Sequence, residues 1–129
     1  MTEFAAAGIN KVYYGERIND RCKVYITTRQ NTEAGPLLGT VELPFIGRHS
    51  PDGFEWGYGG SGPAELALAI LTDLLGKKPP HLMYHSFKIA IIAHLDRYQW
   101  YITDHAVTSW VKDFEAREAA AGRAIHDGK

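Results

Sequence analysis

The chain has little cysteine: Cys22 is the one thiol among 129 residues. One cysteine excludes an intramolecular disulfide, and chains without a disulfide framework are typical of reducing compartments. The first residues lack the charged region and apolar stretch of a secretory signal, and no apolar run approaches the length of a membrane span. These absences predict a soluble cytoplasmic protein without a membrane partner.

The chain also lacks an excess of charge of either sign. Its 14 lysines and arginines nearly balance its 15 aspartates and glutamates, and the one dense basic step is Lys77-Lys78. Dedicated nucleic-acid binders usually show a basic excess, so nucleic acid is not an expected partner. Hydrophobic residues make up 45% of the chain, which is enough for one core and predicts a single domain over residues 1–129.

The first half of the sequence carries the pattern of β-strands. Cys22, Val24 and Ile26 alternate with polar residues and share one face of an expected strand. The pair Asn19-Asp20 before it favours a reverse turn. Further strands are expected at residues 11–14, 38–43 and 54–58, and breaker-rich loops at residues 30–36 and 47–53.

The second half carries the pattern of three helices. They are expected at residues 63–75, ended by Gly76, at residues 81–97, and from a cap at Thr103 or Asp104 onward. The alanine-rich, charged end at residues 115–129 is predicted to fray. The prediction is an α+β fold: an antiparallel sheet of four or five strands, from the N-terminal half plus one strand near 98–103, packed on three α-helices with the first helix central.

The stretch WGYGGSGPAELALAIL, residues 56–71, holds the densest glycine cluster. Residues 57–62 match G-x-G-x-x-G, but no second parallel strand ending in an acidic residue follows, as a dinucleotide fold requires. No Lys-Ser or Lys-Thr follows the glycines, which excludes a Walker loop. Pro63 stands where a nucleophile elbow needs glycine. We therefore expect no cofactor at this stretch.

The same glycines lead into a helix, and a helix N-terminus exposes unpaired N–H groups that hold phosphate or carboxylate. Ser61 or Gly62 is the expected N-cap, and Glu65 is expected to reach back to a free amide and to repel an incoming anion. Two interpretations stay open: a structural hinge, and a contact site for a ligand or partner. If Gly62 has a positive φ, Gly62→Val is expected to strain the backbone.

Residues 54–71 resemble a signature of a small family of uncharacterised proteins found in phages, plasmids and their prokaryotic hosts. The segment FKIAIIAHL, residues 87–95, together with Trp100 and Ile102, is similar too. The resemblance implies a mobile-element setting, in which small proteins bind host factors or the signals of host defence. The family has no assigned activity, so it implies no catalytic residues.

Other candidates for chemistry each have a structural alternative. His81 and His85 have a spacing that can hold a metal, but no third ligand is evident, so no metal site is expected. His94 is expected to be a buried histidine, and Cys22 a buried, inert thiol. Glu55 and Glu65 lie on either side of the glycine turn and approach each other in space if the turn is tight.

Aromatic residues are numerous for so small a core. Tyrosine and tryptophan that reach the surface favour partner contacts and stacking pockets, although most of these rings are expected to fill the core. In the strand near 98–103, Trp100 and Ile102 share one side, so Tyr101 is expected on the opposite face.

The leading functional hypothesis is a non-enzymatic accessory protein of mobile-element type, which binds and inhibits a host defence protein through exposed aromatics and the glycine turn. The alternative is a binder that sequesters a phosphate-bearing nucleotide, cyclic forms included, with the amides of Gly59 to Gly62 on the phosphate and the ring of Trp56 or Tyr58 stacked on the base. An enzyme ranks third, because no nucleophile–base set can be assembled. A homodimer is compatible with the sequence. The candidate site residues are Trp56, Tyr58, Gly59, Gly60, Ser61, Gly62 and Glu65.

Four arginines discriminate between the two binding hypotheses. If two of them converge on the glycine turn, the nucleotide interpretation gains, because arginine is well suited to phosphate. If the turn is packed under side chains, the protein-partner interpretation gains. The four are Arg17, Arg21, Arg29 and Arg48.

Overall fold

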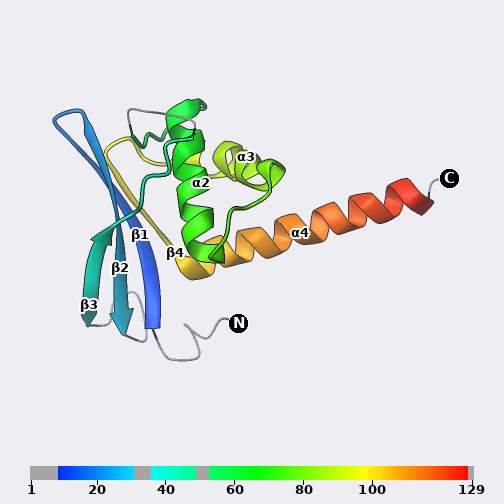
Figure 1. Cartoon of the computed structure of the whole chain (residues 1–129), viewed down its shortest axis with the longest axis horizontal. Coiled ribbons are helices and arrows are strands. Elements are labelled where there is room, and N and C mark those ends of the chain that lie inside the picture. Colours follow the sequence, from blue (N-terminus) through cyan, green and yellow to red (C-terminus); the bar gives the residue numbers. More distant parts are fainter. Residues whose placement is uncertain (1–8, 31–35, 49–52, 128–129) are drawn as a thin grey trace.

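The computed structural model describes residues 9–30, 36–48 and 53–127 and shows an α+β fold, as the sequence predicts (Figure 1). Four antiparallel strands form one sheet, and three α-helices pack beside it. The elements in chain order are β1 (Ile9–Ile18), β2 (Arg21–Gln30), β3 (Leu37–Glu42), α2 (Ser61–Leu75), α3 (His81–Ala90), the short 3₁₀ helix η1 (Ile92–His94), β4 (Gln99–Thr103) and α4 (Asp104–Asp127).

The sheet has the strand order β3-β2-β1-β4. The predicted turn at Asn19-Asp20 is confirmed: both residues have positive φ, 52° and 64°, and they close the β1–β2 hairpin. Two successive left-handed residues match the right-handed twist of the strands they connect. The turn thereby sets the hairpin register, in which Tyr13 lies opposite Ile26.

Helix α2 lies at the centre of the core, as predicted, with buried residues continuous from Gly62 to Leu71. It packs against the sheet face that presents Tyr13 and Trp100. Gly15 lies opposite Trp100 in the register, and a Cβ at this glycine would collide with the indole. The Trp100 ring therefore packs over β1 at Gly15, where the strand has no side chain.

Asp73 ties α2 to the sheet. Its Oδ2 accepts a hydrogen bond from the Tyr13 hydroxyl at 2.7 Å and one from Lys11 Nζ at 2.9 Å. Burial and the neighbouring carboxylate of Asp73 raise the pKa of Tyr13 far above its usual range, so the hydroxyl is protonated and donates at neutral pH.

The first turns of α4 attach it to the domain. The predicted cap at Thr103 is confirmed, because its Oγ1 accepts the Ala106 N–H at 3.0 Å. Val107 and Val111 are buried, whereas residues 115–121 are exposed, and the second half of the helix projects beyond the sheet (Figure 1). Within the described residues, no helix combines the length and the apolar character needed to cross a membrane.

Two predicted elements differ from the structure. Residues 54–58 form no strand, so the sheet has four strands and not five. The helix expected over 81–97 ends at Ala90, and η1 turns the chain toward β4. The turn continues at Asp96, whose carboxylate accepts the N–H groups of Tyr98 and Gln99. His94 consequently lies exposed on η1, and the prediction that it is buried is wrong.

Candidate functional site

The glycine segment leads into α2 two residues earlier than predicted, at Ser61 instead of Pro63. The helix begins at Ser61, and its N-cap is Gly60, an extended residue with φ 174° and no capping side chain. The predicted N-cap at Ser61 or Gly62 is therefore wrong. Ahead of the cap, Gly57 has a φ of 87°, a left-handed conformation that glycine adopts without steric cost.

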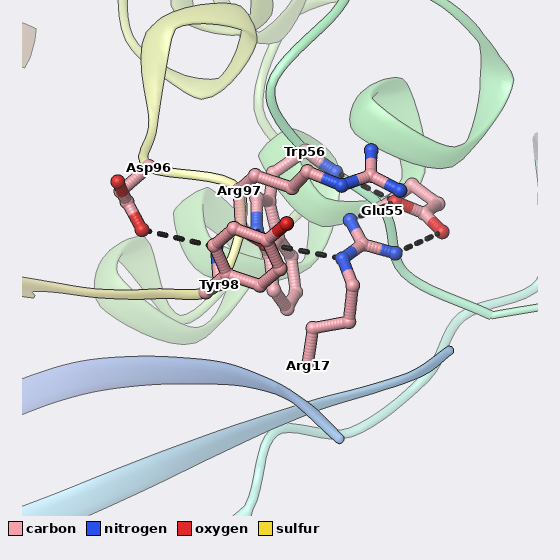
Figure 2. A network of polar contacts seen from close by, with 6 residues as sticks. All are labelled: Arg17, Glu55, Trp56, Asp96, Arg97 and Tyr98. Carbon is pink, nitrogen blue, oxygen red and sulfur yellow. Dashed lines mark hydrogen bonds and ion pairs between the residues drawn. The ribbon is translucent and has the colours of Figure 1, made fainter. Parts of the chain in front are cut away.

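An ion pair joins this segment to β1, as Figure 2 shows. Arg17 donates through Nη1 and Nη2 to the two carboxylate oxygens of Glu55, at 3.0 and 2.7 Å. The same guanidinium donates through Nε to the carbonyl of Arg97 at 3.1 Å. Hydrogen bonding from Arg17 lowers the pKa of Glu55 below its usual value, so the pair is fully charged at neutral pH.

Trp56 belongs to the core. Its side chain is 1% exposed, and its Nε1 donates to the Arg97 carbonyl at 2.9 Å. The ring meets Trp100 edge to face, with centroids 5.4 Å apart. The Arg17 guanidinium lies 5.3 Å from the centre of the Trp56 ring, and Figure 2 shows these two side chains together. The hypothesis that Trp56 stacks on a nucleotide base is therefore wrong, because both the ring and its N–H are already bound within the fold.

Glu65 has a structural role that the sequence did not indicate. The side chain is completely buried, and Oε2 accepts the Gly47 N–H at 2.7 Å. Because α2 starts at Ser61, Glu65 lies in the second turn and not in the first, and its Oε2 faces the loop after β3. Glu55 and Glu65 bind different partners and do not form an acid/base pair.

Gly59, Gly60 and Gly62 of the glycine turn differ in whether they have room for a side chain. Gly62 lacks the positive φ that the sequence argument considered, but a Cβ there would lie 2.5 Å from Glu55 Cβ. At Gly60, a Cβ would lie 2.9 Å from the Tyr58 ring, whereas the space around Gly59 is open. Gly62 is thus required by close approach between the helix start and Glu55.

A cavity of about 620 Å³ lies between the end of the β1–β2 hairpin and the glycine turn. Three predicted site residues line it, Tyr58, Ser61 and Gly62, and the Tyr58 ring is 51% exposed. Arg21 and Lys23 are its basic residues, opposed by Asp20 and Glu55. The full lining is Asp20, Arg21, Cys22, Lys23, Gly53, Phe54, Glu55, Tyr58, Ser61 and Gly62.

The arginines do not converge on the turn as free cations. Arg21 lines the cavity, and Arg17 approaches the turn but is neutralised by Glu55. Arg29 lies opposite Asn10, at the other end of the hairpin, and Arg48 is exposed on the loop after β3. Of the four arginines, Arg21 alone lines the cavity beside the turn, with Lys23 as a second basic residue there, whereas the nucleotide interpretation asked for two arginines at the turn.

Cys22, His81 and His85 are three candidates for reactive or metal-binding groups. Cys22 is half-buried in the cavity lining, and burial and the charge of Glu55 raise its pKa to about 11, so it is a thiol near neutral pH. The rings of His81 and His85 stack 5.5 Å apart. Among the residues that the structure describes, no three histidine, cysteine or acidic side chains are placed to share a metal ion.

A row of tyrosines crosses the sheet face opposite the helices, and sequence reasoning missed it. Tyr14 on β1 lies opposite both Tyr25 on β2 and Tyr101 on β4. The Tyr14 and Tyr25 rings stack with centroids 6.4 Å apart, and Tyr101 is 67% exposed, on the face predicted for it. The sequence contained a signal for this pairing. A two-residue turn at residues 19–20 places residue 18 opposite residue 21, and counting back along both strands places Tyr14 opposite Tyr25.

These features define a small α+β domain with a packed glycine turn on one side and an aromatic sheet face on the other. The chain belongs to a family of unknown function, DUF6166, whose model matches residues 13–113. No curated protein and no solved structure matches the chain.

We predict that Gly62→Ala destabilises the protein by about 1–3 kcal/mol, because the new methyl group overlaps the Glu55 side chain. Gly59→Ala is the matched control, since the space around Gly59 is open, and its effect should stay within about 0.5 kcal/mol. Urea unfolding of both variants measures the difference. Equal stability of the two would show that the helix start tolerates a side chain.

We predict that Glu55→Gln removes part of the pH dependence of stability. The pKa of Glu55 is lowered in the folded state, so its contribution is present above the unfolded pKa, near 4.5, and is lost as pH falls through the folded value. The variant should lose about 1–2 kcal/mol at pH 7 and much less at pH 3.

The control for this prediction is Glu42→Gln, which breaks the exposed pair with Lys23 at 3.4 Å. Surface pairs contribute little, so its unfolding free energy should change equally little at both pH values. Urea midpoints at pH 7 and pH 3 measure both variants. A similar pH profile for the two would contradict a stabilising role for the Arg17–Glu55 pair.

Proposed function

We propose that this protein acts by binding another protein through the open face of its sheet, with no chemistry of its own. The observation that carries the proposal is the tyrosine row formed by Tyr14, Tyr25 and Tyr101. Tyrosine offers a large rigid ring and a polar tip, and it loses little conformational entropy on binding. The three tyrosines lie in register across three neighbouring strands, and the rings of Tyr14 and Tyr25 stack.

The charges around the row favour a protein over a nucleic acid. On the same sheet face, Glu16 accepts a hydrogen bond from the Tyr14 hydroxyl at 3.0 Å, and Lys23 pairs with Glu42 at 3.4 Å. Acidic and basic side chains thus alternate around the rings, whereas a surface for nucleic acid would carry a basic excess. An aromatic centre with a mixed polar rim is the anatomy of a protein interface.

The partner in this proposal is a protein of the host cell, and specifically a defence protein that binding would inhibit. This part rests on the resemblance of residues 54–71 to proteins carried by phages and plasmids. Inhibition by occupying a partner's surface needs affinity and a complementary shape, but no catalytic group. The raised pKa of Cys22 is in keeping with this, because it disfavours the nucleophilic thiolate.

A second candidate function is sequestration of a phosphate-bearing nucleotide, and the cavity beside the glycine turn favours it. Its volume of about 620 Å³ is in the range of small-molecule sites. Tyr58 offers a half-exposed ring for a base, and Arg21 and Lys23 offer charge for a phosphate. The opposing carboxylates of Asp20 and Glu55 make this candidate the weaker one.

For the protein-binding function, we predict that Tyr101→Ala weakens partner binding by at least about tenfold while the melting temperature stays unchanged. Leu82→Ala is the control, because Leu82 is similarly exposed but lies on α3, away from the row. A partner is first captured from host lysate with the wild-type chain, and the purified partner is then titrated calorimetrically against both variants. Equal affinities would place the interface elsewhere.

For the nucleotide candidate, we predict that millimolar nucleotide raises the melting temperature of the wild-type chain and not that of Arg21→Ala. The probes are AMP, ATP and cyclic di-nucleotides. Arg29→Ala is the charge-matched control, since Arg29 lies at the far end of the hairpin and should leave the shift intact. Absence of any shift, or a shift that Arg21→Ala retains, would remove this candidate.

A further inference from the structure

The edge strand β3 leaves a core position uncovered. In the sheet register, Val41 lies opposite Ile26, which lies opposite Tyr13, so the three side chains share the face that packs on the helices. Tyr13 and Ile26 are buried, yet Val41 is 61% exposed. Figure 1 shows β3 at the edge of the sheet remote from β4 and the start of α4. An apolar side chain on the core face without a cover indicates an interaction surface.

The backbone of β3 is also unpaired on its outer side. Leu43 donates its N–H to the Val24 carbonyl, and in an antiparallel ladder the hydrogen-bonded residues alternate. Val41 therefore directs its N–H and C=O toward β2, whereas Thr40 and Glu42 direct theirs away from the sheet. Within the described ranges, β3 pairs with β2 and with no other strand.

Protection against pairing is sparse along this edge. Natural edge strands usually carry lysine, proline or an inward charge that discourages an added strand. β3 has the sequence LLGTVE, with no lysine or proline, and its one charge, Glu42, is paired with Lys23. A bulge at Thr28/Arg29 disturbs the start of the strand, so the regular stretch that remains begins at Gly39.

We propose that two copies of this chain associate through β3, antiparallel about a two-fold axis at Val41, into one eight-stranded sheet. In this register Thr40 of each chain lies opposite Glu42 of the other, and these residues exchange four backbone hydrogen bonds. No like charges oppose each other. Val41 meets its own copy on the core face and becomes covered.

A second copy of this chain is favoured as the occupant because β3 is complementary to itself in this register. Leu43, the residue after the strand, lies opposite Gly39 of the other chain, and the space around Gly39 is open. Leu38 and Phe45 are exposed apolar residues at the two ends of the segment. In this register, Leu38 of one chain lies at the same end of the paired strands as Phe45 of the other chain. An isologous contact closes at two chains and does not form fibres.

The inference is independent of the proposed function. The tyrosine row lies on the opposite sheet face, so a dimer leaves it accessible and presents it twice. Loss of dimerisation and loss of partner binding are therefore separate outcomes.

The test measures self-association of the full chain by sedimentation velocity from micromolar concentrations up to about 1 mM. The wild-type chain should dimerise. Thr40→Pro removes an outward N–H while leaving the bonds to β2 intact, and it should lower the association constant by more than about tenfold. Thr40→Val keeps the N–H and should dimerise like the wild type. A monomer at every concentration, or a folded Thr40→Pro variant that still dimerises, would overturn the proposal.

A disulfide test reads the register directly and does not depend on Thr40→Pro folding. In a Cys22→Ser background, Val41→Cys places two thiols across a non-hydrogen-bonded pair, where Cα atoms lie about 4.5 Å apart and a disulfide is allowed. Thr40→Cys places them diagonally, about 7–8 Å apart, beyond disulfide reach. Val41→Cys should cross-link rapidly on mild oxidation and Thr40→Cys slowly. Equal rates, or the reverse order, would overturn this register.

Discussion

The contact between Glu55 and Gly62 determines how the helical layer sits on the sheet. A Cβ at Gly62 would lie 2.5 Å from Glu55 Cβ, so the start of α2 rests directly on this side chain. The carboxylate of Glu55 holds Arg17 of β1, and the next residue, Trp56, inserts its ring into the core. One residue thereby joins the helix start, the sheet and the core.

This contact also explains why a glycine-rich stretch that looks suited to a ligand is largely structural. Gly57 supplies a left-handed turn, Gly60 lies against the Tyr58 ring, and Gly62 makes room for Glu55. The helix N-terminus retains its partial positive charge, but Glu55 lines the adjacent cavity and opposes an anion there. The surfaces free for recognition therefore lie mainly on the sheet.

Local signals in the sequence were sufficient for the hairpin turn, the cap of α4 and the existence of the central helix, although not for the N-cap of that helix. Asn19-Asp20 predicted the hairpin turn, and Thr103 predicted the cap of α4, because each acts within a few residues. Glu65 and Trp56 were misassigned because their partners, Gly47 and Arg97, lie 18 and 41 residues away. No periodicity reports a hydrogen bond over such a separation, and an aromatic ring beside glycines looks the same whether it is buried or exposed.

The two sheet surfaces differ in what they require from the environment. Tyr101 carries a hydroxyl that water can solvate, so its exposure costs less free energy than the exposure of a purely apolar side chain. Val41 has no polar group, and its exposure on the core face costs free energy for as long as it lasts. The proposed dimer would keep the β3 edge covered permanently, and the proposed partner would bind the tyrosine face reversibly. One small domain can combine the two because they use different surfaces. The helices cover β4, β1 and β2 on the core face, and in the proposed dimer a second chain would cover Val41 of β3.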